Sequence, residues 1–311
     1  MNVLFDKDIE SIPMSISIRA IEDFFESAKL NKVVTPTRSS INTDKGGLTF
    51  TMGAEVNTSK TIGFRVYDTY PNESPEKQGS NTDQIVVVYS TEKSELKTVV
   101  IGSLLGAIRT AAIGGYAAKL MSNKDANNVC IIGAGLQAYY QIKAMLAVRD
   151  IKEIHICNRT ISKAQNLKDK LELEFDLTNL KITANEPSVI EKKLKTADII
   201  ICATNSNKPV LQKKWIKQGA YVASIGPKFH NNHELPLDIL SSSNITISDA
   251  PEQLKAYPKK YFLDDLNNIH AIENYSKLDK TKNGYQLFLS TGRSGTEVIV
   301  ADYLNSYLKV I

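Results

Sequence analysis

The sequence has very few cysteines. There are three among 311 residues, too few and odd in number for a disulfide framework. Each lies inside an apolar run, at Cys130, Cys157 and Cys202, a setting typical of a thiol that serves as a small buried hydrophobe. Because the three are far apart in the sequence, we expect neither a disulfide nor a metal site.

Long hydrophobic runs are also missing. No stretch approaches the roughly 18 uncharged apolar residues that a membrane span needs. The start, MNVLFDKDIE, carries acids where a signal peptide needs a cationic region and an apolar run. We therefore expect a soluble, cytoplasmic protein without a membrane partner.

A large net charge is absent as well. Lys and Arg total 38 and Asp and Glu total 34, which leaves +4. No basic cluster is interleaved with aromatics, so we expect no nucleic-acid partner. The 42% of hydrophobic residues argues against disorder. The lack of a G-x-S-x-G motif leaves acyl transfer without support.

What is present is a pattern for two α/β domains, which suits the length at about 150 residues per domain. Between residues 119 and 290, short apolar strands alternate with helical segments, which predicts a parallel sheet covered on both faces, a Rossmann domain. A smaller mixed α/β domain is predicted for residues 1–118 together with 291–311. It contains a long polar loop (Asp68–Asp83), a buried helix (Ser103–Met121) and four strand-like runs. These runs are Val33–Ile41, Leu48–Val56, Thr61–Tyr70 and Gln84–Tyr89.

The strongest local signal is the segment VCIIGAGLQAYYQIKAML. An apolar strand runs into Gly133, Gly135, Leu136 and Gln137 and then directly into a helix. The first glycine permits a tight turn, and the second lets the backbone approach a pyrophosphate. The helix then offers free N–H groups to that anion. This arrangement predicts dinucleotide binding, although a glycine-rich turn that binds nothing would look similar.

The following strand indicates which dinucleotide. An NAD site commonly ends this strand with an acid that holds the ribose 2′-hydroxyl. Here the strand ends in Asn158, Arg159 and Thr160, which favours NADP over NAD because a guanidinium suits a 2′-phosphate. Alternatively, Arg159 lies over the adenine and allows either cofactor.

Two later strand ends belong to the same predicted crevice. Ala203 and Thr204 follow one apolar strand, and Gly226 follows the next. Ligands of doubly wound sheets bind outside the carboxyl ends of their strands. We therefore add these three residues to the predicted cofactor site.

Three arginines occur in apolar company: Arg38, Arg65 and Arg109. A buried cation needs an anionic partner. A substrate carboxylate held by bidentate forks is one such partner. This interpretation is favoured for Arg109, whose sequence neighbours include no acid. The alternative is a set of internal ion pairs with Glu55, Asp68 or Asp83.

Taken together, the segments TPTR, IGFRVY, GAIRTAA, IIGAGLQA, CNRT, ADIIICAT, SIG…HELP and FLSTG resemble the ornithine cyclodeaminase/μ-crystallin family along essentially the whole chain. The resemblance implies a homodimer that pairs through the first domain, and an active site between that domain and the Rossmann domain. It also implies that Arg38 and Arg109 hold a substrate carboxylate and that Thr110 lies beside the cofactor phosphates.

Two departures from the family pattern bear on the reaction. Arg65 replaces a lysine of the family's cyclodeaminases, and Lys228 replaces their acid–base aspartate. Arginine keeps the charge but hardly releases a proton. Loss of the aspartate disfavours cyclodeamination. Arg65 and Lys228 remain the candidate catalytic residues, with Lys228 as a proton donor or as the ligand of a second carboxylate.

The resulting hypothesis is an NAD(P)-dependent oxidoreductase acting on the C–N bond of a small α-amino or α-imino acid. It would be an imine reductase or an amino-acid or opine-type dehydrogenase. Two alternatives remain open at this point. One is an ornithine cyclodeaminase that forms proline and ammonia with catalytic NAD. The other is a non-catalytic, crystallin-like ligand-binding protein.

Overall fold

The computed structural model describes residues 1–44, 46–68, 84–176, 178–256, 261–281 and 283–310. The chain forms two compact units, the first of Met1–Ala112 with Gly292–Ile311 and the second of Ile113–Thr291. The first division falls inside helix α3 (Leu104–Met121), whereas we predicted boundaries after residues 118 and 290. Apart from Asp68, the predicted loop Asp68–Asp83 lies outside the described residues.

The first unit is built on one sheet with the strand order β1-β7-β6-β5-β4-β2, and β3 pairs with β4. Neighbouring strands in this sheet are antiparallel, except that β1 and β7 are parallel. The strands are β1 (Asn2–Phe5), β2 (Val33–Val34), β3 (Ser39–Asn42), β4 (Gly47–Glu55), β5 (Thr61–Asp68), β6 (Ile85–Ser90) and β7 (Leu96–Ile101).

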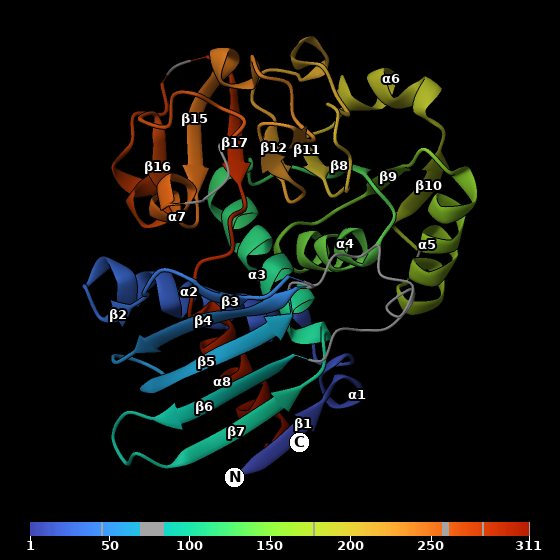
Figure 1. Ribbon diagram of the computed structural model, residues 1–311. Helices are drawn as coiled ribbons and strands as arrows, with labels where there is room; N and C mark the ends of the chain where they lie inside the picture. The colour runs from blue at the N-terminus through green and yellow to red at the C-terminus, as the bar shows by residue number, and fades with distance from the viewer. Residues whose placement is uncertain (45, 69–83, 177, 257–260, 282, 311) are drawn as a thin grey trace. The chain divides into compact units, whose positions relative to one another are not determined.

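Helices cover one face of this sheet. Figure 1 shows α8 (Thr296–Leu308), the red C-terminal helix, behind strands β4 to β7. It packs against the amphipathic α2 (Met14–Lys29), whose Phe24 and Phe25 are buried. The unit also contains the short helix α1 (Asp6–Ile9) and the first part of α3. The C-terminal segment thus completes the core that the N-terminal strands begin.

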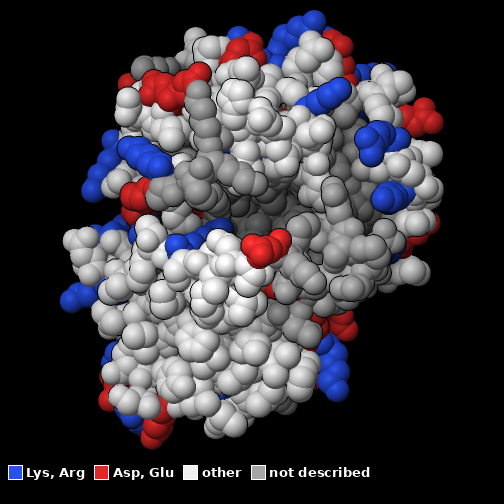
Figure 2. Space-filling model, in the orientation of Figure 1, with Lys and Arg blue, Asp and Glu red and all other residues white. Residues whose placement is uncertain are grey.

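The other face of the sheet is apolar across five strands. By the strand register, Met52, Phe64, Val87, Val99 and Val3 form one continuous row. Figure 2 shows this face almost free of charged side chains. Its partly exposed large side chains include Val3, Phe5, Leu48, Met52, Ile62, Ile85 and Tyr89, which are 38–47% exposed. An apolar surface of this extent marks an interaction site.

One strand prediction for this unit needs correction, and two strands of the sheet were missed. The run Val33–Ile41, predicted as one strand, forms the two short strands β2 and β3, and Pro36, which has no amide hydrogen to donate, lies between them. Strands β1 (Asn2–Phe5) and β7 (Leu96–Ile101), which pair with each other, were not predicted.

The second unit contains an eight-stranded sheet of order β10-β9-β8-β11-β12-β17-β15-β16 in which every pairing is parallel. Its order reverses between β8 and β11, the switch point of a doubly wound fold. The strands are β8 (Asn128–Ile132), β9 (Glu153–Cys157), β10 (Lys181–Asn185), β11 (Ile199–Cys202), β12 (Tyr221–Ser224), β15 (Ser243–Ser248), β16 (Ile269–Ala271) and β17 (Tyr285–Leu289). The predicted α/β fold with a Rossmann sheet is confirmed.

Short helices connect these strands. They are α4 (Leu136–Val148), α5 (Ile161–Glu174), α6 (Ile190–Leu194) and α7 (Pro251–Ala256), and a small hairpin follows β12, formed by β13 (Lys228–Phe229) and β14 (Asn232–His233). Strands β10 and β16 were not predicted. The last strand in the sequence, β17, lies inside this sheet between β12 and β15.

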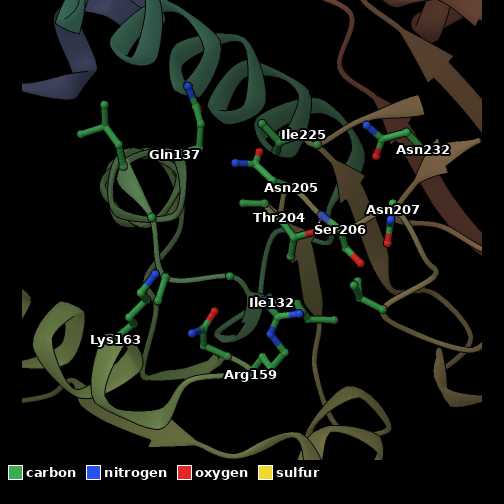
Figure 3. A pocket seen from close by; sticks show the side chains of 18 residues that line it. Ile132, Gln137, Arg159, Lys163, Thr204, Asn205, Ser206, Asn207, Ile225 and Asn232 are labelled. Carbon is green, nitrogen blue, oxygen red and sulfur yellow. Dashed lines mark hydrogen bonds between the residues drawn. The ribbon is translucent and has the colours of Figure 1, made fainter. Parts of the chain in front are cut away.

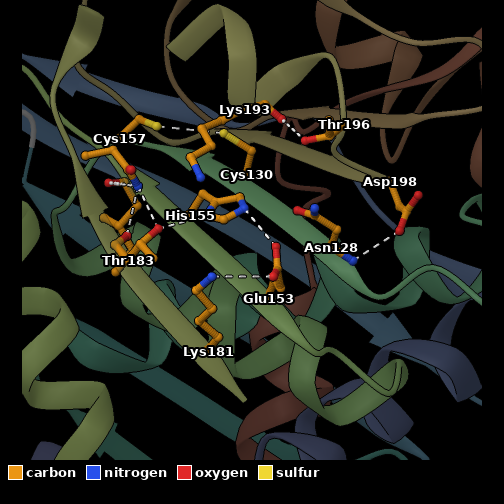
Figure 4. A network of polar contacts seen from close by, with 12 residues as sticks. Asn128, Cys130, Glu153, His155, Cys157, Lys181, Thr183, Lys193, Thr196 and Asp198 are labelled. Carbon is orange, nitrogen blue, oxygen red and sulfur yellow. Dashed lines mark hydrogen bonds and ion pairs between the residues drawn. The ribbon is translucent and has the colours of Figure 1, made fainter. Parts of the chain in front are cut away.

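The three cysteines are buried free thiols, as predicted. Although distant in sequence, Cys130 and Cys157 lie on the paired strands β8 and β9 with their sulfurs 3.8 Å apart (Figure 4). His155, also on β9, contacts Glu153 on its own strand and Thr183 on the neighbouring β10, and burial lowers its pKa. Within the described residues, no three His, Cys, Asp or Glu side chains gather to hold a metal ion, and no helix could cross a membrane.

Candidate functional site

A cavity of about 1050 Å³ lies at the switch point of the parallel sheet. Its walls come from the turn after β8 and from the carboxyl ends of β9, β11 and β12. Nine of the predicted cofactor residues line it: Gly133, Gly135, Leu136, Gln137, Asn158, Arg159, Ala203, Thr204 and Gly226. The other two, Thr110 and Thr160, are not among its lining residues.

The glycine turn has the geometry that a pyrophosphate site requires. Gly133 has a φ of +117°, and a Cβ added there would meet the Ala203 carbonyl oxygen at 2.3 Å. Gly135 precedes α4, and a Cβ added there would meet no atom within 4 Å. The space above Gly135 is therefore open at a helix N-terminus. This combination fits a dinucleotide phosphate.

The end of β9 contributes basic and amide groups. Figure 3 shows Arg159 and Lys163 at the border of the cavity, across from Thr204, Asn205 and Ser206. Lys163 lies on the first turn of α5 and was not among the predicted residues. The Thr160 carbonyl accepts a bond from Asn158 Nδ2, so Thr160 shapes this turn through its backbone.

The opposite wall is held together by one carboxylate, that of Glu234. Its Oε2 accepts bonds from Thr204 N at 3.0 Å and Thr204 Oγ1 at 2.8 Å. Its Oε1 accepts bonds from Ser224 Oγ at 2.7 Å and Gly226 N at 2.6 Å. Sequence reasoning missed this residue. The available signal was an acid within the SIG…HELP segment, eight residues after Gly226.

A second, smaller cavity of about 160 Å³ adjoins the first, since Ile225 and Gly226 line both. Lys228 lines it together with apolar and hydroxyl side chains: Phe229, Leu254, Tyr261, Ser290 and Thr291. The Lys228 ammonium donates a bond to the Gly226 carbonyl at 2.7 Å. An amino group thus lies beside the larger cavity, next to the wall formed by Ile225 and Gly226.

Burial changes the acidity of this lysine. Lys228 is 7% exposed, and desolvation lowers its pKa to about 8 although Glu234 and Asp249 oppose the shift. A group with a pKa near neutral can both hold and release a proton at physiological pH. The geometry therefore fits the role of proton donor that the sequence suggested.

Arg65 and Arg109 share an acidic partner that sequence reasoning missed. Arg65 Nη1 and Arg109 Nη2 bind the same oxygen of Glu297 on α8, at 2.8 and 2.6 Å. The acids considered from the sequence were Glu55, Asp68 and Asp83. Glu55 instead accepts bonds from the turn at residues 57–59, and Asp83 lies outside the described residues. No local pattern links Glu297 to Arg109, because 188 residues separate them.

The two neighbouring guanidinium groups favour the ionised form of Glu297. Burial raises its pKa, but Arg109 and Arg65 outweigh that effect and bring the pKa to about 2. Two guanidinium groups share this one carboxylate, so the three side chains together keep a positive charge. Arg65 is further fixed by Gln84 and by the ring of Tyr67.

Arg38 and Arg109 approach each other over Gly292. A Cβ added to Gly292 would meet Arg109 Nη1 at 2.6 Å and Arg38 Nη2 at 3.0 Å, and its φ is +81°. Arg38 also donates a bond to the Gly292 carbonyl at 2.5 Å. The structure therefore brings the predicted carboxylate ligands together. Thr110, one residue after Arg109, bonds its own helix at the Gly106 carbonyl.

A doubly wound parallel sheet with a glycine turn and a large cavity at its switch point defines a dinucleotide-binding α/β protein. Residues 3–285 match the family model for the ornithine cyclodeaminase/mu-crystallin family. The chain belongs to this family, as its sequence segments predicted.

Known proteins agree with this assignment. The chain is 27% identical to a Δ(1)-pyrroline-2-carboxylate reductase of Bacillus cereus over 286 residues, 88% of this chain and 86% of the relative. The structure of a Thermococcus litoralis Δ(1)-pyrroline-2-carboxylate reductase with NADH and L-proline superimposes with a TM-score of 0.82 and 22% identity, covering 100% and 99% of the two chains. An archaeal alanine dehydrogenase dimer with NAD superimposes with a TM-score of 0.82 and 23% identity, covering 99% and 97%.

Proposed function

We propose that this chain is an NAD(P)-dependent oxidoreductase that acts on the C–N bond of a small α-amino or α-imino acid. The observation that carries the proposal is the shared wall at Ile225 and Gly226, which sets a buried lysine beside the dinucleotide cavity. The names of the relatives support the same reaction class. Oxidation of NADPH or NADH in the presence of a cyclic imino acid is the test.

When bound, the dinucleotide supplies or accepts a hydride. The chain's own residues would hold it: the N–H groups at the start of α4 and the backbone of Gly133 and Gly135 at the pyrophosphate, and Thr204 and Gly226 at the nicotinamide end. A side chain at position 135 would fill the open space above Gly135 that the pyrophosphate would occupy.

NADP is the preferred cofactor in this proposal. No acid stands at the end of β9 to hold a ribose 2′-hydroxyl, and the two basic side chains at this part of the cavity are Arg159 and Lys163. The two solved structures named above contain NAD or NADH, so the preference for NADP depends on the β9 end of this chain alone.

Arg159→Ala should therefore raise the KM for NADPH by about 10- to 100-fold, since a hydrogen bond to a charged group contributes about 1.5–3 kcal/mol. The KM for NADH should stay within about threefold. Steady-state kinetics with both cofactors measures the ratio. Lys168→Ala, elsewhere on α5, is the matched control. An equal change for both cofactors would show that Arg159 does not read the 2′-phosphate.

The substrate carboxylate would bind Arg38 and Arg109, which converge over Gly292. Arg65 would support them by holding Glu297 in place rather than by moving a proton. Lys228 would transfer the proton to or from the substrate nitrogen. In the direction of imine reduction it must begin protonated, which holds below a pH of about 8.

The apolar outer face of the first unit's sheet would form the interface of a homodimer. It spans strands β1, β7, β6, β5 and β4 and is almost uncharged (Figure 2). Obligate interfaces of this kind are apolar like a domain core.

The double substitution Ile62→Lys and Ile85→Lys places two charges on this face and should convert the dimer to a monomer of 34.4 kDa. Sedimentation equilibrium at micromolar concentration measures the mass. Leu173→Lys changes a side chain that is highly exposed on α5 of the other unit, and should leave the dimer intact. A double variant that remains dimeric would place the interface elsewhere.

A further inference from the structure

One buried acid connects the walls of both cavities. Glu234 is 0% exposed, and each of its carboxylate oxygens accepts one backbone N–H and one hydroxyl. Of the donor residues, Thr204 follows β11, Ser224 ends β12 and Gly226 lies just after β12. Four such bonds compensate the desolvation of a buried carboxylate and fix its orientation.

The backbone of Gly226 connects Glu234 to Lys228. Its N–H donates to Glu234 Oε1 at 2.6 Å, and its carbonyl accepts the bond from Lys228 Nζ at 2.7 Å. A Cβ added to Gly226 would meet the Thr204 carbonyl oxygen at 2.2 Å and Glu234 Oε2 at 2.5 Å. The Gly226 backbone is therefore hydrogen-bonded to both the Glu234 carboxylate and the Lys228 ammonium, and position 226 has no room for a side chain.

We propose that Glu234 is the positioning residue of this site. It holds Thr204 and Gly226 at the spacing that the nicotinamide end of the cofactor requires, and it orients Lys228 through Gly226. This inference rests on the proposed function. Glu234 itself need not contact cofactor or substrate, because its four bonds are all made to the surrounding chain.

Glu234→Gln is the principal test. The amide keeps the size of the side chain, but its NH₂ would face two of the donors that now bind a carboxylate oxygen. We expect the dissociation constants of NADPH and NADH to rise at least tenfold, measured by isothermal titration calorimetry. The basic limb of the pH profile should also move to lower pH, because Lys228 then loses one of the two carboxylates, Glu234 and Asp249, that oppose the lowering of its pKa by burial.

Asp198→Asn is the matched control. The Asp198 carboxylate accepts bonds from Asn127 N, Asn128 N and Lys217 Nζ at 3.0, 3.1 and 2.5 Å, and so joins the beginnings of β8 and β11 rather than their ends. It should lower thermal stability without changing cofactor affinity or the pH profile. A purely structural role of Glu234 would make the two variants alike in both readouts.

Ser224→Ala provides a second variant should Glu234→Gln fail to fold. Ser224 is fully buried and does not line the cavity, so its hydroxyl can act on the cofactor only through Glu234. We expect its loss to weaken cofactor binding at least threefold. Wild-type affinity in Ser224→Ala and in any folded Glu234→Gln would overturn the inference while leaving the proposed function intact. Failure of the wild-type protein to bind either cofactor would instead overturn the proposed function, and the inference with it.

Discussion

Arg109→Ala should lower kcat/KM for the amino or imino acid by about 100-fold. The side chain is 4% exposed and converges with Arg38 over Gly292, so its removal takes away a charged, bidentate ligand of the substrate carboxylate. Two hydrogen bonds to a charged group contribute about 3 kcal/mol, which corresponds to about two powers of ten. Steady-state kinetics at fixed saturating NADPH measures the change.

The same substitution removes one of the two cations that bind Glu297, so stability must be checked alongside activity. Thermal unfolding shows whether each variant is folded at the assay temperature. Arg109→Lys keeps the charge without the planar fork and should recover part of the activity. Arg149→Ala is the control, since that guanidinium binds only backbone carbonyls in the contacts described, among them those of Asn123 and Ala118. A kcat/KM for Arg109→Ala within about threefold of wild type would refute the carboxylate clamp.

Lys228→Met should lower kcat by about 10² to 10⁴, the usual contribution of a general acid or base. Methionine has a similar length and suits the apolar side of the small cavity. The KM values should change little, because the substrate carboxylate and the cofactor bind elsewhere in this account. Lys217→Met, which removes a lysine paired with Asp198, is the matched control.

The pH dependence distinguishes proton transfer from simple charge. Burial lowers the pKa of Lys228 to about 8, so the group is protonated below that pH and neutral above it. In the direction of imine reduction the proton donor must be charged. Activity should therefore be constant well below pH 8, fall to half near pH 8, and decrease about tenfold per pH unit well above it. The limb should be absent in Lys228→Met. An unchanged limb in that variant would assign it to another group.

The dinucleotide site could be predicted because its signals are local. The strand, the glycines at 133 and 135 and the helix follow one another directly between Asn128 and Val148, and each glycine has a separate steric reason. Parallel strands buried on both faces are continuous apolar runs, so β8, β9, β11 and β12 were found. Strands β1 and β10 are short, carry polar residues, and depend on neighbours that no local pattern identifies.

The support of the site could not be predicted in the same way. Glu297 reaches Arg65 and Arg109 only because the C-terminal helix returns to the first unit. Glu234 connects the ends of two strands. One of its partners, Thr204, lies more than 20 residues before it in the sequence. In both cases the charged side chain is visible in the sequence, but its partners are set by tertiary packing.

The most direct test of the central claim follows NADPH and NADH oxidation with Δ(1)-pyrroline-2-carboxylate and related cyclic imino acids, and with 2-oxo acids plus ammonia or amines. Ammonia release from ornithine is measured in parallel. The account predicts that at least one imino acid, or one oxo acid with its amine, oxidises a stoichiometric amount of reduced cofactor, faster with NADPH than with NADH. Ammonia release from ornithine without net cofactor turnover would identify a cyclodeaminase. Tight cofactor binding with no oxidation under any condition would contradict the assignment as an oxidoreductase.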